Sequence, residues 1–271
     1  MSLETGGSLW LVGCGNMAGA MLGGWLDAGL DPAEVTVIRP SGVQPAPGIR
    51  TLTEVPEGET PATLLLAVKP QKLDEVAPAV APALGPETVV VSILAGVELA
   101  TLRARFPAPA TVARAMPNTP VALRKGVTCL FTDSEDAAAR ARIERLMAAL
   151  GRAEWFDEEE LFAMAGHLTG AGPAFLYRFI DALAAAGEQL GLPGAQAARL
   201  AASMVEGAGA LAVCSDETPE RLAARVASPG GTTEAGLKVL DGADGLRPLV
   251  LRTLDASRRR GIAMAEAARG G

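Results

Sequence analysis

The first stretch suited to chemistry is a glycine turn with the spacing Gly-x-Gly-x-x-Ala, set between an apolar run and a helical pattern. In such a turn the first glycine permits the tight bend, and the second lets a pyrophosphate approach the backbone. The helix that follows points its N-terminus at the anion. The same spacing occurs in ordinary strand-to-helix turns, but its position here predicts a dinucleotide site. The residues of the turn are Gly13, Cys14, Gly15, Asn16, Met17 and Ala18.

The type of dinucleotide is indicated where the next apolar run, residues 35–38, is followed by Arg39-Pro40-Ser41. NAD sites usually place an acidic side chain here, bonded to the ribose 2′-hydroxyl. A cation and a hydroxyl suit a 2′-phosphate instead, so Arg39 and Ser41 favour NADPH, with NADH still possible. The alternative is that Arg39 is simply a solvated loop charge.

A second glycine-rich stretch, Ser228-Pro-Gly-Gly-Thr-Thr-Glu234, precedes a helical pattern in the other half of the chain. Free backbone N–H groups at a helix start would hold a carboxylate, and the two threonine hydroxyls would bond a polar atom beside it. The alternative is a glycine loop capped by threonine.

Acids and bases suited to proton transfer are scarce. The chain has one histidine, His167, a residue type that more often packs than catalyses, and four lysines without an obvious catalytic partner. An enzyme that oxidises an alcohol normally needs a base for the hydroxyl proton, whereas a protonated imine needs positioning and one hydrogen-bond partner. The scarcity of acids and bases therefore favours a substrate with a C=N bond over an alcohol.

These residues need a sheet to position them. Continuous apolar runs predict buried parallel strands at residues 9–12, 35–38, 63–68, 88–93 and 111–114. An added edge strand is expected at 127–131, a helix at 135–150 and a last short strand at 153–156. In a doubly wound sheet, ligands bind beyond the carboxyl ends of the strands. One rim is therefore expected to carry the loops at Gly13, Arg39, Lys69, Ala95 and Asn118.

From residue 158 onward the pattern is helical. The acidic run at 157–160 is interpreted as a helix start and a solvated face, not as a metal site. Helices are expected at 172–191, 195–214, 219–226, from 232, and at 246–268. Because these helices are rich in alanine, we expect a second subunit to complete them. The predicted division is a dinucleotide-binding domain at 1–157 and a helical substrate and dimerisation domain at 158–271.

Composition limits the partners. The 271 residues are 49% hydrophobic, enough for a large core, and the formal charge of −7 argues against nucleic acids and anionic membranes. We expect no membrane-spanning segment, because no apolar run approaches the roughly 20 residues needed to span a bilayer. Three scattered cysteines predict reduced thiols in a cytoplasmic protein, without a metal cluster.

Five motifs in order make the chain resemble the Δ1-pyrroline-5-carboxylate reductase family over residues 8–268. They are residues 13–18, Ala67-Val-Lys-Pro70, Arg114-Ala-Met-Pro-Asn-Thr-Pro120, Gly170-Ala-Gly-Pro-Ala174 and Ser228-Pro-Gly-Gly-Thr-Thr233. The resemblance implies an NADPH- or NADH-dependent reduction of pyrroline-5-carboxylate to L-proline, the last step of proline synthesis. It also implies a Rossmann-like sheet domain followed by an all-α dimerisation domain, whose dimers often assemble into decamers.

The resemblance further implies roles for individual residues. The dinucleotide would be held by residues 13–18 together with Arg39, Ser41, Ala67, Val68, Lys69, Pro70, Ala95 and Gly96. Met116 and Asn118 would lie near the nicotinamide. The substrate carboxylate would be held by Gly230, Gly231, Thr232 and Thr233. The Thr233 hydroxyl would bond the ring nitrogen, which Asp216 would also face, in a site shared across the dimer.

Three residues depart from the family pattern. Ala171 stands where the family usually has Ser, Phe175 where it has Tyr, and Thr218 where His commonly precedes the proline. Losing these polar groups would weaken substrate binding, but the backbone donors remain. We therefore expect activity to be retained.

Three other functions stay under consideration. The β-hydroxyacid dehydrogenases share a two-domain plan but carry a catalytic lysine where this chain has Leu176, which counts against them. A reductase of another cyclic imine acid is a second alternative, because the size of the substrate ring is selected by side-chain packing, which the sequence does not reveal. A non-catalytic NADP-binding regulator also stays open, although the intact residues 230–233 argue against it.

Overall fold

The computed structural model describes residues 3–269 and divides into two compact units. The first unit contains the chain up to Ala171 and again from Arg258, and the second contains Gly172–Ser257. The predicted domain boundary at 157/158 falls just before a helix that belongs to the first compact unit. That boundary stays a prediction, since compactness alone does not define a functional domain.

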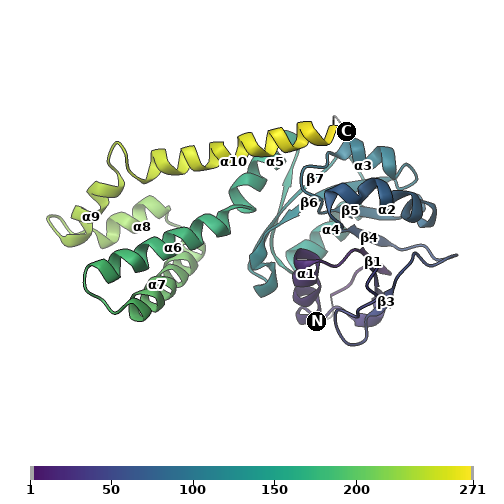
Figure 1. Cartoon of the computed structure of the whole chain (residues 1–271), viewed down its shortest axis with the longest axis horizontal. Coiled ribbons are helices and arrows are strands. Elements are labelled where there is room, and N and C mark those ends of the chain that lie inside the picture. The colour runs from purple at the N-terminus through teal and green to yellow at the C-terminus, as the bar shows by residue number, and fades with distance from the viewer. Residues whose placement is uncertain (1–2, 270–271) are drawn as a thin grey trace. The chain divides into compact units, whose positions relative to one another are not determined.

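The first unit is built on one eight-stranded sheet with the strand order β3-β2-β1-β4-β5-β6-β7-β8 (Figure 1). All neighbouring strands are parallel except β6 and β7. This confirms the doubly wound, Rossmann-like fold. The strands are β1 (Leu9–Val12), β2 (Val35–Ile38), β3 (Arg50–Leu52), β4 (Thr63–Leu66), β5 (Val89–Ser92), β6 (Thr111–Pro117), β7 (Gly126–Thr132) and β8 (Gly151–Phe156).

Helices cover both faces of the sheet, which explains why its central strands are apolar throughout. Every residue of β1, β2, β4 and β5 is buried. One core joins the sheet to α1 (Asn16–Asp27) and α4 (Ala137–Ala148). The other core joins it to α2 (Leu73–Val80), α3 (Leu99–Arg105) and α5 (Glu159–Thr169).

Two expectations about the sheet are corrected. Residues 127–131 do not form an edge strand, because β7 pairs with β6 on one side and with β8 on the other. The strand expected at 111–114 continues to Pro117, since the antiparallel partner β7 pairs with its last residues. The short edge strand β3 was not predicted.

The second unit contains only helices among its described elements. They are α6 (Gly172–Gln189), α7 (Gly194–Cys214), α8 (Pro219–Val226), α9 (Thr232–Leu240) and the first part of α10 (Leu246–Arg269). Helices α6 and α7 pack together, with Gly187 close to Ala197. None of the described residues of α6, α8 and α9 is buried.

Helix α7 differs from the expectation that no stretch is apolar enough to span a membrane. Its 21 residues reach a mean hydropathy of 1.3 over an 18-residue window, of which 11% is buried. By length and composition alone it therefore qualifies. Its exposed side chains include Leu200, Met204 and Leu211. A large exposed apolar surface marks a site of contact with another protein surface or with a membrane.

Candidate active site

Strand register brings the predicted loops to one rim of the first unit. Val12 ends β1 opposite Ile38 of β2 and Leu66 of β4, and Leu66 stands opposite Ser92 of β5. The next residues along the chain start the loops at Gly13, Arg39, Ala67 and Ile93. Because parallel strands end together here, side chains from distant parts of the sequence meet at one edge.

A cavity of about 1200 Å³ opens at this rim. Its lining includes eight of the fourteen residues expected to hold the dinucleotide, namely Gly13, Cys14, Gly15, Arg39, Ser41, Ala67, Val68 and Lys69. Ala18 is instead buried in the core below, in α1. The remaining five do not line the cavity: Asn16, Met17, Pro70, Ala95 and Gly96.

The glycine turn has the local geometry that a pyrophosphate requires. Gly13 adopts φ of 85°, and a Cβ there would lie 2.7 Å from the carbonyl oxygen of Ala67, so a side chain does not fit. A Cβ on Gly15 would meet nothing within 4 Å, which leaves space above the backbone. Helix α1 begins after Gly15 with no side-chain cap and no acidic residue in its first turn. Its first N–H groups therefore suit an anion.

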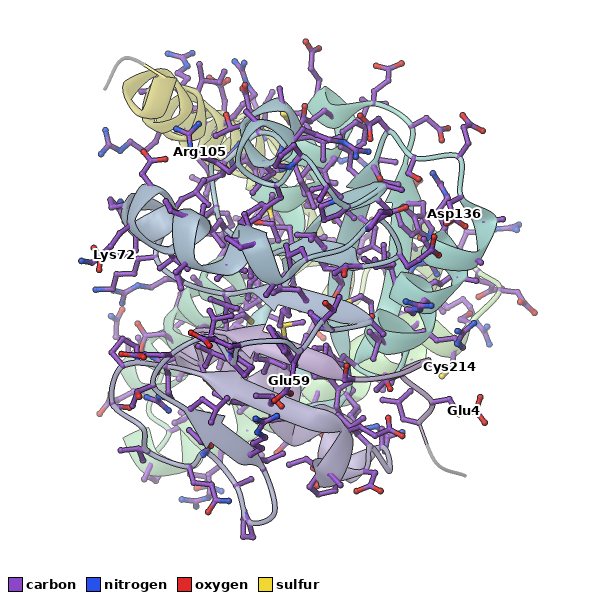
Figure 2. The ribbon with its side chains drawn as sticks, turned by 90° about the vertical axis from the view of Figure 1, so that its right-hand side faces the viewer. Glu4, Glu59, Lys72, Arg105, Asp136 and Cys214 are labelled. Carbon is purple, nitrogen blue, oxygen red and sulfur yellow. The ribbon has the colours of Figure 1, made fainter. Side chains whose placement is uncertain are left out.

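Part of the cavity wall was missed by sequence reasoning. It is formed by the segment 53–58, between β3 and β4, and by α2 with the 3₁₀ turn before it. Val55, Val76 and Ala79 give this wall an apolar part. Lys72, whose side chain is labelled in Figure 2, pairs with Glu75 at 2.5 Å. The only available signal was the apolar spacing of α2, which by itself indicates core packing.

Cys14 is a half-buried thiol in the turn. Burial raises its pKa, and the nearby charge of Arg39 opposes that rise less strongly. The thiol is therefore protonated at neutral pH, so its role in the turn is that of a small side chain. Arg39 and the glycine turn line the same cavity.

Met116 and Asn118 lie at the end of β6. They differ in whether their side chains are free to contact a ligand. Asn118 is buried, and its amide donates to the carbonyl of Thr169 at 3.1 Å and accepts from the N–H of Val127 at 2.8 Å. Its side chain therefore holds protein segments together. Met116 is half-buried and packs against Gly166 of α5, where a Cβ would lie 1.9 Å from its sulfur.

The loop at residues 230–233 belongs to the second unit and leads into α9. The N–H of Gly230 donates to the Glu234 carboxylate at 2.5 Å, and the N–H of Gly231 donates to the carbonyl of Ser228 at 2.9 Å. The first helical residues, Thr232 and Thr233, have N–H groups without an intrahelical acceptor. Those two groups are thus the donors best suited to an external carboxylate.

Glu234 also forms an ion pair with Lys238, four residues further along α9, at 2.8 Å. Lys238, and to a lesser extent the Gly230 N–H, lowers the pKa of Glu234. The carboxylate is therefore ionised at neutral pH, and its contact with the loop persists there. The bond back to Gly230 was not predicted from the sequence.

The segment between α7 and α8 carries Asp216, which is exposed. Beside it, the Thr218 hydroxyl accepts a hydrogen bond from the N–H of Arg221 and so caps α8. The threonine that departs from the family pattern therefore has a structural use. Phe175, another departure, lies in the first turn of α6, which Ala171 precedes.

His167, on α5, packs against Gly261 of α10, both within the first unit. Partial burial, and secondly the charge of Arg258, lowers its pKa, so the ring is neutral at pH 7. This matches the packing role expected for it. Across the described residues, no group of three or more His, Cys, Asp or Glu side chains could hold a metal ion.

Two family models match the chain. One, described as pyrroline-5-carboxylate reductase dimerisation, matches residues 159–264. The other, described as NADP oxidoreductase, coenzyme F420-dependent, matches residues 8–96. The first covers the helical half, and the second covers the strands that carry the glycine turn.

Curated relatives match over nearly the whole chain. The pyrroline-5-carboxylate reductase of Pseudomonas aeruginosa is 37% identical, with 94% of this chain and 96% of the relative covered. That of Escherichia coli is 34% identical, covering 90% and 93%. Among solved structures, the pyrroline-5-carboxylate reductase of Coxiella burnetii superposes with a TM-score of 0.88 at 31% identity, covering 95% and 98%. The Plasmodium falciparum enzyme, solved with NADP bound, has a similar fold, with a TM-score of 0.82 at 22% identity and the same coverage.

Proposed function

The chain belongs to the pyrroline-5-carboxylate reductase family, and we propose how its own residues divide the work of that reaction. It is an oxidoreductase that transfers hydride from a nicotinamide cofactor to the C=N bond of Δ1-pyrroline-5-carboxylate and gives L-proline. This completes proline biosynthesis. The observation that carries the conclusion is full-length similarity to named reductases, joined to a cavity at the carboxyl ends of the strands.

NADPH is the proposed form of the cofactor. The cavity wall places Arg39 and Ser41 just beyond β2, where a cation and a hydroxyl suit the 2′-phosphate. The pyrophosphate would lie over the glycine turn and the start of α1, where the geometry fits an anion. The other proposed cofactor contacts are residues 67–70 and the Ala95-Gly96 pair.

The nicotinamide supplies the hydride, and the chain's residues supply orientation. Met116 is proposed to lie beside the nicotinamide. The N–H groups of Thr232 and Thr233 are proposed to hold the substrate carboxylate, with Gly230 and Gly231 shaping the loop around it. The Thr233 hydroxyl bonds the ring nitrogen, and the exposed Asp216 favours its protonated form. A protonated imine needs no strong base, which agrees with the neutral, packed His167.

The protein is a homo-oligomer that carries the family's dimerisation domain. We propose a dimer formed through the helical unit, with five dimers forming a decamer, in the cytoplasm. Support comes from the exposed apolar side chains of α7, which a second subunit would cover.

Turnover provides the direct test. Purified protein is incubated with pyrroline-5-carboxylate and either NADPH or NADH, and consumption of the reduced cofactor is followed while proline is identified as product. Fast turnover with a preference for NADPH is expected. Tight NADPH binding without turnover would contradict the substrate and redirect the search to larger or smaller cyclic imine acids.

A further inference from the structure

We propose that Glu159 is a positioning residue, which holds the loop before α3 and the end of β6 in a fixed relation. This inference rests on the proposed function, because that loop contains Ala95 and Gly96 and the end of β6 contains Met116. All of these residues belong to the first unit. Glu159 was interpreted from sequence as part of a solvated acidic face, and the structure places it otherwise.

One oxygen of Glu159 connects two separate elements. Its Oε1 accepts from the backbone N–H of Leu99 at 2.7 Å and from the guanidinium of Arg114 at 2.7 Å. Leu99 begins α3, and Arg114 lies in β6. Because Glu159 is itself the first residue of α5, a single carboxylate ties three elements together.

The bond to Leu99 replaces a cap that α3 lacks. Glu98 is the N-cap residue of α3 but makes no side-chain capping bond to it. Helix starts normally need such an acceptor for their first N–H groups. Glu159 provides it from 60 residues further along the chain. The N–H group that it binds belongs to Leu99, which follows Gly96 closely in the loop before α3.

The bond to Arg114 holds Glu159 against β6. The Arg114 side chain is only 7% exposed, and its guanidinium lies 4.6 Å from the ring centre of Phe162, also on α5. Burial lowers the pKa of Arg114, and the charges of Glu159 and, more weakly, of Glu98 oppose this, so the group stays charged at neutral pH. A buried guanidinium that loses its carboxylate is strongly destabilised, so the two elements cannot separate freely.

Helix α5 transmits this constraint to Met116. Met116 follows Arg114 by two residues on β6 and packs against Gly166 of α5, where no larger side chain fits. The same helix accepts the amide of Asn118 through the carbonyl of Thr169. Glu159 therefore fixes one end of a helix whose other end contacts the segment proposed to face the nicotinamide.

Substitutions separate positioning from mere stability. Glu159→Ala removes both bonds, and Glu159→Gln keeps an acceptor oxygen for Leu99 and Arg114. The double variant Arg114→Leu with Glu159→Leu removes both charges together, a change that commonly leaves stability intact or raised. It still leaves Leu99 without its acceptor. Glu160→Ala is the matched control, because Glu160 is an exposed acid in the same helical turn.

For each variant the Kd of NADPH is measured without substrate, and Tm, kcat and the KM of the imine are measured separately. Glu159→Ala is expected to raise the Kd about tenfold, the size of one lost charge-assisted contact, and to lower kcat while leaving the KM of the imine nearly unchanged. Glu159→Gln is expected to recover most of both. The double variant is expected to recover Tm but not the Kd, and Glu160→Ala to match the wild type.

The proposal is overturned if Glu159→Ala lowers Tm while the Kd of NADPH stays at the wild-type value. It is equally overturned if the double variant restores both quantities together. The proposed function is tested apart from this, by wild-type turnover. A wild-type protein that binds NADPH but reduces no imine would contradict the reaction and leave the comparison of Kd values valid.

Discussion

Thr233 is the side chain proposed to act closest to the reacting bond. Its hydroxyl is exposed in the first turn of α9, where it would bond the ring nitrogen of the substrate. We expect Thr233→Ala to lower kcat about tenfold, because one hydrogen bond to a charged group is lost, and to leave the Kd of NADPH unchanged. Thr233→Ser keeps the hydroxyl and should retain most of the activity. Equal turnover by all three proteins would remove Thr233 from the mechanism.

Arg39 is expected to bind the 2′-phosphate of NADPH. Substituting Arg39→Asp replaces a cation in the cavity wall with an acid that suits a free 2′-hydroxyl. The ratio of kcat/KM for NADPH to that for NADH should fall by about tenfold or more, as expected for the loss of a charge-assisted contact. The NADH rate serves as the internal control. An unchanged ratio would show that Arg39 does not contact the phosphate.

His167 should make stability depend on pH. Its pKa is below the ordinary 6.5 because of partial burial and the charge of Arg258, so the unfolded chain binds the proton more tightly than the folded chain. Stability from the neutral ring is complete above pH 6.5 and is lost as the pH falls below that value. The Tm of the wild type should therefore fall more on acidification than that of His167→Gln. Parallel curves would contradict this, and activity at neutral pH should differ little.

Residue roles at the site were only partly accessible to sequence reasoning. The glycine turn was predictable because the steric needs of Gly13 are local. Glu159 was not, because nothing in four consecutive acidic residues, 157–160, shows which one meets a buried arginine. The same holds for Asn118, whose amide donates to the carbonyl of Thr169, 51 residues further along the chain.

At the level of elements, the packing of α10 against α5 gives a prediction in which two effects oppose each other. Alanine favours a helix interior by about 1 kcal/mol over glycine. At Gly261, however, the new Cβ would lie 2.3 Å from the His167 ring. We expect Gly261→Ala to lower the free energy of unfolding by about 1–3 kcal/mol, as overpacking does, measured by urea titration.

Two matched variants check the cause of that loss. Gly23, in α1, is exposed, and its Cβ would meet nothing within 4 Å, so Gly23→Ala should be neutral or stabilising. Combining Gly261→Ala with His167→Ala should relieve the clash. A double variant as unstable as the sum of the single changes would show that the ring is not the obstacle.

Elements were predictable where a local pattern was sufficient. The central strands are continuous apolar runs because they are buried on both faces, so their positions were predictable from the sequence. Strand β3 has no such run: Arg50 is exposed and its neighbours are half-buried. The interior position of β7 depends on pairing with β8, a long-range contact that local composition does not encode.

For the whole molecule, the apolar surface of α7 predicts an assembly that charges would break. Leu200 and Leu211 are 53% and 60% exposed within one chain. We expect Leu200→Asp with Leu211→Asp to lower the molar mass measured by light scattering to that of a monomer, because buried unpaired carboxylates oppose association. Val43→Asp, an exposed apolar position in the first unit, is the control and should keep the wild-type mass. An unchanged mass in the double variant would place the interface elsewhere.

Helix α10 has a consequence for the order in which the protein is made. The first unit takes in the chain up to Ala171 and then again from Arg258, so its sheet is translated well before the helical segment that begins at Arg258. Until residue 261 has left the ribosome, His167 lacks the Gly261 surface against which it packs. Domains usually fold in the order of their synthesis. Here both cores of the first unit consist of residues that precede Gly172, whereas the surface of α5 around His167 stays uncovered until residue 261 has been synthesised. A chain that stalls between these two points would expose that surface to proteases.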